Sequence, residues 1–203
     1  MSVAAPVRPV LCLASQSPRR RALLAQIAVP HRVQPAHIDE TPRVDEEPRS
    51  YVQRMAETKA RSVWEQARPD PVLGADTIVV LDGNTLGKPR DREHGLAMLA
   101  ALSGREHLVL TAVALVTEAA AHTRISVSVV RLRATSSEER AAYWASGEPT
   151  DKAGAYAIQG LGAVFVQSLQ GSYSGVMGLP LFETAELLEA AGLQYGWHAG
   201  ARS

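Results

Sequence analysis

The feature that most constrains the fold of this 203-residue chain is the alternation of strand-like and helix-like segments along its sequence. Short apolar runs rich in β-branched residues predict strands, and longer segments with capping and stop signals predict helices. We expect strands at 10–15, 30–36, 72–81, 107–117, 125–135 and 163–169, and helices at 17–27, 46–67, 91–104, 136–147 and 180–192. The turn Asp82-Gly83-Asn84 predicts a hairpin with a short return strand. Strands that alternate with helices indicate an α/β fold, with helices covering a sheet.

The length of the chain suits one substantial core, since domains commonly have about 100–200 residues. The sequence contains no internal repeat, no low-complexity segment and no linker. We therefore expect residues 1–203 to form one domain, with a short N-terminal lead at 1–9 and a candidate disordered tail at 195–203.

Charge and cysteine content limit the setting of the protein. The 21 basic residues balance the 21 acidic ones, so no global charge attracts nucleic acid or a membrane. The one cysteine, Cys12, has no intrachain partner for a disulfide, which favours a reducing compartment. Pro6 and Pro9 interrupt the start of the chain, and no run approaches the ~20 apolar residues of a membrane span. We expect a soluble cytoplasmic protein without nucleic-acid or membrane partners.

The stretch "LASQSPRRRALLAQI" (13–27) places hydroxyls and arginines where a strand runs into a helix. Ser17 is the predicted N-cap, with Pro18 at the first helical position. Helix N-termini attract anions, and Arg19 and Arg20 would add forked donors for a phosphate or carboxylate. The alternative is that Ser17 only caps the helix and the arginines are solvated surface. Both interpretations stay open, because neither the Walker loop nor the dinucleotide-binding glycine pattern is present.

Asp76 interrupts the apolar run "VLGADTIVVL". A buried carboxylate is costly unless it meets a metal, a cation or a hydrogen-bond network. Lys88 follows the return of the hairpin and could lie beside Asp76, so an ordinary ion pair between them is the alternative. "HIDET" adds Asp39 and Glu40 in a loop, where a metal could recruit them, although adjacent acids in loops are more often solvated. The 6 histidines show no zinc-ligand spacing.

Five motifs resemble the Maf family of nucleoside triphosphate pyrophosphatases. They are "LASQSPRR", "GADTIV", "GKP", "EPTDKAGAYAIQG" and "GSYSGVMGLPL", in this order, and the resemblance runs from about Leu11 to Gly192. It implies an elongated mixed sheet flanked by helices, with two lobes, a central cleft and a homodimeric assembly. It also implies hydrolysis of a nucleoside triphosphate to monophosphate and pyrophosphate with a divalent cation, Mg²⁺ or Mn²⁺.

The resemblance also assigns roles to individual residues. Functional positions of the family fall on Ser15, Arg19, Arg20, Glu40, Lys59, Asp76, Thr77, Lys88 and Gln159. Asp76 is implied as the proton acceptor, and Glu40 and Asp76 as metal ligands. The remaining residues would bind substrate, with Arg19, Thr77 and Gln159 as specificity positions.

The wording "DKAGAY…IQG…GSY" resembles the branch that acts on dTTP and UTP. The branch that acts on 7-methyl-GTP tends to have Cys at position 152 and Glu at position 159, where this chain has Lys152 and Gln159. An amide at 159 can accept from N3–H of uracil or thymine and donate to O4. Two alternatives remain: a 7-methyl-GTP pyrophosphatase, and a non-catalytic nucleotide-binding regulator of septum formation. The presence of Asp76, Lys88 and Glu40 favours an enzyme over the regulator.

Overall fold

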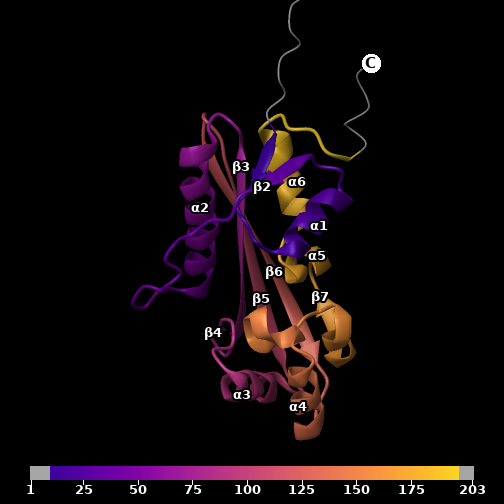
Figure 1. Ribbon diagram of the computed structural model, residues 1–203. Helices are drawn as coiled ribbons and strands as arrows, with labels where there is room; N and C mark the ends of the chain where they lie inside the picture. The colour runs from indigo at the N-terminus through magenta and orange to yellow at the C-terminus, as the bar shows by residue number, and fades with distance from the viewer. Residues whose placement is uncertain (1–9, 197–203) are drawn as a thin grey trace, which may run out of the picture.

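The computed structural model describes residues 10–196 and contains one open, mixed sheet (Figure 1). Its strands are β1 (Leu11–Leu13), β2 (His31–Val33), β3 (Val72–Leu81), β4 (Asn84–Leu86), β5 (Glu106–Val116), β6 (Ala121–Leu132) and β7 (Val166–Gln170). The strand order is β2-β1-β3-β5-β6-β7, and β4 pairs with β3. The pairs of β1 with β2 and β3 are parallel, and the other pairs are antiparallel. The predicted α/β fold with an elongated mixed sheet is confirmed.

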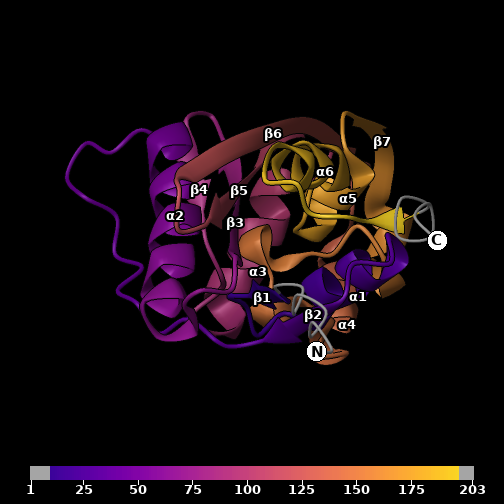
Figure 2. The ribbon, with the colours of Figure 1, turned by 90° about the horizontal axis from the view of Figure 1, so that it is seen from above.

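Helices cover both faces of this sheet. They are α1 (Pro18–Gln26), α2 (Pro48–Ala67), α3 (Arg92–Leu102), α4 (Ser137–Ala145), α5 (Tyr173–Met177) and α6 (Leu181–Ala190), with the 3₁₀ helices η1 (Glu148–Asp151), η2 (Ala153–Ala155) and η3 (Gly160–Phe165). Helix α2 buries its apolar stripe against one face, whereas α1 and α6 pack on the other. Figure 2 shows α2 and α6 on opposite sides of the sheet.

The face of the sheet that α1 and α6 cover carries two separate hydrophobic cores, and these define two lobes. In the upper lobe, Leu23 of α1 and Leu187 of α6 pack on Leu73 and Val113. In the lower lobe, α3, α4 and η3 pack on the other ends of the same strands. Figure 1 shows α1, α2 and α6 around the upper half of the sheet and α3 and α4 at its lower end.

One edge of β3 is interrupted between the lobes. Its other edge pairs with β5 from Val72 to Val80. At the interrupted edge, β1 pairs with 72–73 and β4 with 79–81, and no strand within residues 10–196 pairs with 74–78. Successive side chains of a strand point to opposite faces. Side chains from both faces of the sheet therefore flank this gap.

The main strands, the hairpin and the longer helices lie where the sequence predicts them, but one segment differs. The sequence predicts a strand over 163–169, whereas Gly160–Phe165 forms η3 and β7 begins only at Val166. A short apolar run does not distinguish a strand from a helical turn, and the backbone here is held by hydrogen bonds from a distant side chain, described below. Helix α5 was not predicted.

The predicted lead at 1–9 lies outside the described residues, as do residues 197–203 of the predicted tail. Within the described part of the tail, the Gly196 N–H donates to the Ile27 carbonyl at 2.7 Å. Cys12 is buried in the core and has a free thiol, as expected. Among residues 10–196, no helix has both the length and the apolar character needed to cross a membrane.

Candidate functional site

A cavity of about 770 Å³ opens at the gap in the edge of β3. Its walls come from the β1–α1 turn, the loop before α2, β3, the segment after β4, the η1–η3 region and the end of α5. Every residue that the family resemblance assigns to the site lines this one cavity: Ser15, Arg19, Arg20, Glu40, Lys59, Asp76, Thr77, Lys88 and Gln159. The fold thus gathers side chains from segments far apart in the sequence.

A buried lysine bridges two carboxylates at the centre of the cavity. Asp76 on β3 is 7% exposed and Lys59 on α2 is 8% exposed. Lys59 Nζ lies 2.7 Å from Asp76 Oδ1 and 2.9 Å from Glu40 Oε1. Gly74 permits this contact, because a Cβ there would lie 2.4 Å from the Ala56 carbonyl oxygen and would push α2 away from β3. The cation that meets Asp76 therefore comes from α2.

Lys88 does not pair with Asp76, so the ion pair considered from the sequence is wrong. Strand β4 ends at Leu86, and the Gly87 carbonyl accepts from the Gly154 N–H at 3.0 Å. Lys88 is exposed at the wall of the cavity, and no acidic side chain in the described chain forms an ion pair with it. Its charge is available to an anionic ligand.

Arg20 is held in place by hydrogen bonds from three of its nitrogens. Its Nε donates to the Gly178 carbonyl at 2.7 Å, Nη2 to Thr77 Oγ1 at 3.2 Å, and Nη1 to Ser15 Oγ at 3.4 Å. Burial lowers the pKa of Arg20 from its ordinary value, and the negative charge of Asp76 opposes that shift. The guanidinium stays charged because arginine is not deprotonated in proteins. The interpretation as solvated surface does not hold for Arg20.

The start of α1 differs from the predicted simple cap. Ser17 occupies the N-cap position with extended backbone, but its hydroxyl makes no capping hydrogen bond. Instead, its N–H donates to Ser15 Oγ at 3.1 Å. Arg19 Nη1 lies 3.7 Å from Asp151 Oδ2, which belongs to η1 in the lower lobe. The helix start that faces the cavity thus carries positive charge and lacks a side-chain cap, which suits an anion.

The adjacent acids Asp39 and Glu40 have different roles in the structure. Asp39 Oδ1 accepts from Thr41 Oγ1 at 2.6 Å and from Thr41 N at 2.9 Å, and these bonds lower the pKa of Asp39. Only Glu40 of the two lines the cavity. In the described chain, no cluster of three or more His, Cys, Asp or Glu could form a closed metal site. Glu40 and Asp76 carry the oxygen atoms that a Mg²⁺-like ion prefers, and substrate phosphates and water would supply its other ligands.

Apolar and aromatic side chains also line the cavity, and the sequence identified this part of the lining only in part. Gln159 lines the same cavity as Tyr156, Ile158 and Val176. Tyr156 Oη is 2.7 Å from His107 Nε2, and burial lowers the pKa of His107 to about 4, so this imidazole is neutral at pH 7. No sequence signal marks His107, whereas Tyr156 falls within the motif "EPTDKAGAYAIQG".

The geometry defines a class of protein: an α/β protein with an interlobe cleft whose basic side chains suit a polyanion and whose amide and apolar side chains suit a planar group. Basic side chains and a buried carboxylate line the cleft together with an amide and several apolar side chains. Residues 10–191 match the family model described as "Maf-like protein", and the chain belongs to the Maf family.

Curated relatives agree with this membership over nearly the whole chain. A protein of Alkalilimnicola ehrlichii named dTTP/UTP pyrophosphatase is 54% identical over 197 residues, 94% of this chain and 97% of the relative. Proteins of the same name from Saccharophagus degradans and Nitrosomonas europaea are 55% and 50% identical, over 89% and 93% of this chain and 88% and 97% of their own. The solved Staphylococcus aureus Ham1 protein aligns with 60% of this chain and 71% of its own at 12% identity, with a TM-score of 0.37, too weak a likeness to support an argument.

Proposed function

We propose that this protein hydrolyses dTTP and UTP to the nucleoside monophosphate and pyrophosphate. The observation that carries the proposal is the cleft itself, where several cations surround one buried carboxylate at the edge of β3. The names of relatives at 50–55% identity support the choice of substrate.

The cations match the charge of the substrate. A nucleoside triphosphate carries about four negative charges, and its transition state for hydrolysis is stabilised mainly by positioning and charge neutralisation. Arg19 and Arg20 project from the first turn of α1. Lys88 follows β4 at the other end of the β3 gap and forms no ion pair with any residue between 10 and 196. Lys59 adds a buried charge at the centre. Together these side chains would hold the phosphates across the gap.

Asp76 is the proposed proton acceptor. Glu40 and Asp76 would hold a Mg²⁺ or Mn²⁺ ion, which neutralises charge on the phosphates. Water attacks the α-phosphorus in line with the departing pyrophosphate, and Asp76 accepts its proton or orients it. The 2.7 Å contact with Lys59 Nζ holds the Asp76 carboxylate at the wall of the cavity. This chemistry requires neither a redox cofactor nor a covalent nucleophile.

Gln159 is the proposed reader of the base, with Thr77 and Arg19 contributing to specificity. Its side-chain amide has no hydrogen-bond partner among the described residues, although it lines the cavity. An amide oxygen and NH₂ match N3–H and O4 of uracil and thymine.

We further propose a cytoplasmic homodimer in which residues 1–203 form one domain. The single free cysteine supports a reducing compartment, and the sheet shared by both lobes supports one folding unit. Light scattering after gel filtration tests the dimer, because its mass should be twice the 21.8 kDa of the chain.

The function is tested by incubating the protein with dTTP, UTP, CTP, GTP and 7-methyl-GTP, with and without EDTA, and measuring pyrophosphate release. We expect release from dTTP and UTP only when a divalent cation is present. Equal or better turnover of 7-methyl-GTP would assign the protein to the sister specificity. Nucleotide binding without any release of pyrophosphate would favour the regulator.

A further inference from the structure

Both carboxylate oxygens of Glu148 accept hydrogen bonds from the turn that follows Gln159. Its Oε2 accepts from the Leu161 N–H at 2.9 Å, and its Oε1 accepts from the Gly162 N–H at 2.9 Å. These are N–H groups of the first turn of η3, which have no partners inside the helix. A carboxylate from η1 therefore caps the start of η3.

Tyr143 of α4 extends this contact to the other side of Gln159. Its hydroxyl donates to Glu148 Oε1 at 2.7 Å and accepts from the Ala157 N–H at 3.1 Å. The backbone is thus fixed two residues before Gln159 and again two residues after it. The turn passes so close to the carboxylate that a Cβ at Gly160, where φ is +71°, would lie 2.3 Å from Glu148 Oε2.

This arrangement leaves the amide of Gln159 available to a ligand. Gln159 is the N-cap residue of η3, a position from which a side chain often bonds the N–H groups of the first turn. Its side chain makes no such bond, and Glu148 occupies two of those N–H groups instead. The capping function and the cavity-facing function are therefore divided between two residues.

We propose that Glu148 is a positioning residue for base recognition: it fixes the turn at 160–162 so that Gln159 presents its amide to the pyrimidine edge. This inference rests on the proposed function, in which Gln159 reads the base. Nothing in the catalytic chemistry requires Glu148, since it does not line the cavity.

Glu148 keeps its charge at neutral pH. Burial opposes ionisation, but the N–H groups of Gly162 and Leu161 and the Tyr143 hydroxyl outweigh it, so the pKa of Glu148 lies below the ordinary 4.5. A charged acceptor of two backbone N–H groups is stronger than a neutral one. Glutamine at 148 would lose that charge, and its NH₂ would face an N–H donor.

The test measures base preference by binding, independently of turnover. Dissociation constants are determined calorimetrically for the α,β-methylene analogues of dTTP and GTP, with the unmutated protein and Glu148→Gln. We expect the preference for the dTTP analogue to fall about tenfold, as for a displaced hydrogen-bonding group. The decisive comparison adds Glu148→Gln to Gln159→Ala. If Glu148 acts through Gln159, the second change causes no further loss of preference.

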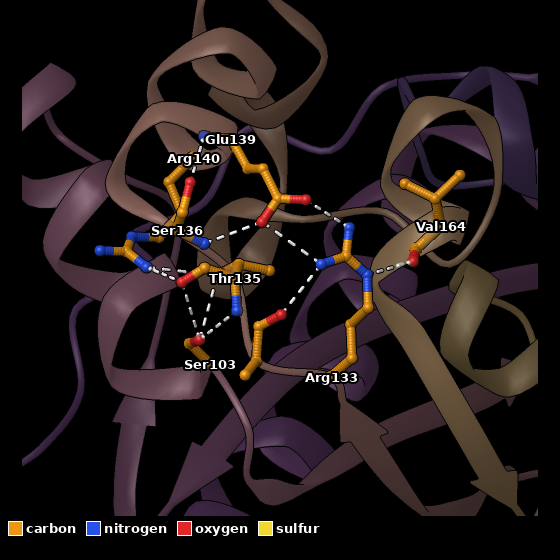
Figure 3. Close-up of polar contacts among 8 residues, drawn as sticks. Ser103, Arg133, Thr135, Ser136, Glu139, Arg140 and Val164 are labelled. Carbon is orange, nitrogen blue, oxygen red and sulfur yellow. Dashed lines mark hydrogen bonds and ion pairs between the residues drawn. The ribbon is translucent and has the colours of Figure 1, made fainter.

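A second variant and a matched control separate positioning from general loosening. Tyr143→Phe removes the other support of the turn and should lower the same preference to a smaller extent. Glu139→Gln is the control. Glu139 accepts from the Ser136 N–H at 2.8 Å and from Arg133 Nη2 at 2.7 Å. Arg133 Nε in turn donates to the Val164 carbonyl, near the end of η3, at 3.0 Å. Figure 3 shows these contacts. We expect this variant to lower the melting temperature without changing base preference.

The outcomes are distinct. An equal loss of preference in Glu139→Gln, or an additive loss in the double variant, overturns the positioning role. An unchanged preference in Gln159→Ala refutes base reading by Gln159, and the inference then fails with it. A further outcome is that the unmutated protein binds the dTTP analogue selectively and yet releases no pyrophosphate from dTTP itself. That result refutes hydrolysis, while the role of Glu148 is still decided by the binding data.

Discussion

Replacing Asp76 by asparagine tests the assignment of the proton acceptor. Asparagine has nearly the same shape and keeps an oxygen that can accept from Lys59 Nζ, so the packing of α2 on β3 should persist. The variant cannot accept a proton. General-base catalysis contributes about 10²–10⁴-fold, so we expect kcat to fall at least about 100-fold. That factor corresponds to about 2.7 kcal/mol of activation free energy.

The structure also sets the expected cost in stability. Lys59 keeps Glu40 as a partner at 2.9 Å, so its charge is not left unpaired. The loss should be about 1–2 kcal/mol of unfolding free energy, below the 3–5 kcal/mol typical of an orphaned buried charge. For a chain of this size the melting temperature would fall by about 2–8 °C.

The assay is pyrophosphate release from dTTP, with binding of the α,β-methylene analogue measured in parallel. Binding should change little, because the variant keeps every basic side chain of the cavity, and these side chains carry most of the binding. Asp82→Asn is the matched control, since Asp82 follows β3 and pairs with Arg105 at 2.7 Å outside the cavity. Near-normal turnover by Asp76→Asn would refute the reasoning.

Three further predictions concern other parts of the site. Arg20→Ala should lower kcat/KM for dTTP and also the melting temperature, because the guanidinium binds the Gly178 carbonyl; unchanged kinetics would make its role purely structural. Gln159→Glu should reduce the preference for dTTP over 7-methyl-GTP by about 10- to 100-fold in competition assays, since a carboxylate only accepts hydrogen bonds. Burial lowers the pKa of His107 from 6.5 to about 4, so its contribution to stability is complete above pH 6.5 and is lost as the pH falls toward 4. Denaturation at pH 7 and pH 4 should show a loss of about 3 kcal/mol that is missing in His107→Gln; an equal loss in the variant would assign it to other groups.

The sequence predicted elements where local pattern and tertiary packing agree. The long helix at 48–67 and the strands β3, β5 and β6 carry strong periodicity or long apolar runs, and their burial follows the same pattern. Segment 160–165 is different, because its conformation depends on hydrogen bonds from Glu148, a residue in another element. Local propensity contains no information about such a partner.

The sequence predicted which residues lie at the candidate site but not how they contact one another. The family resemblance assigned nine residues to the site and all nine line the cavity, yet sequence proximity suggested Lys88 as the partner of Asp76. Lys59 takes that place because Gly74 lets α2 approach β3, a contact that depends on how the helix crosses the sheet. Likewise, the burial of Arg20 follows from the position of the Gly178 carbonyl, 158 residues away along the chain.

At the interrupted edge of β3, the site depends on which side chains of one strand point to each face of the sheet. Asp76 and Thr77 are neighbours in sequence, yet one meets Lys59 from α2 and the other meets Arg20 from α1, on opposite faces of the sheet. Inserting one residue between Gly74 and Asp76 would exchange the two faces. The carboxylate would then turn toward the guanidinium and the hydroxyl toward the buried ammonium, with the same amino acids present and the site inverted. Length changes in this family should therefore be tolerated in the loops around the gap and excluded from these few positions of β3.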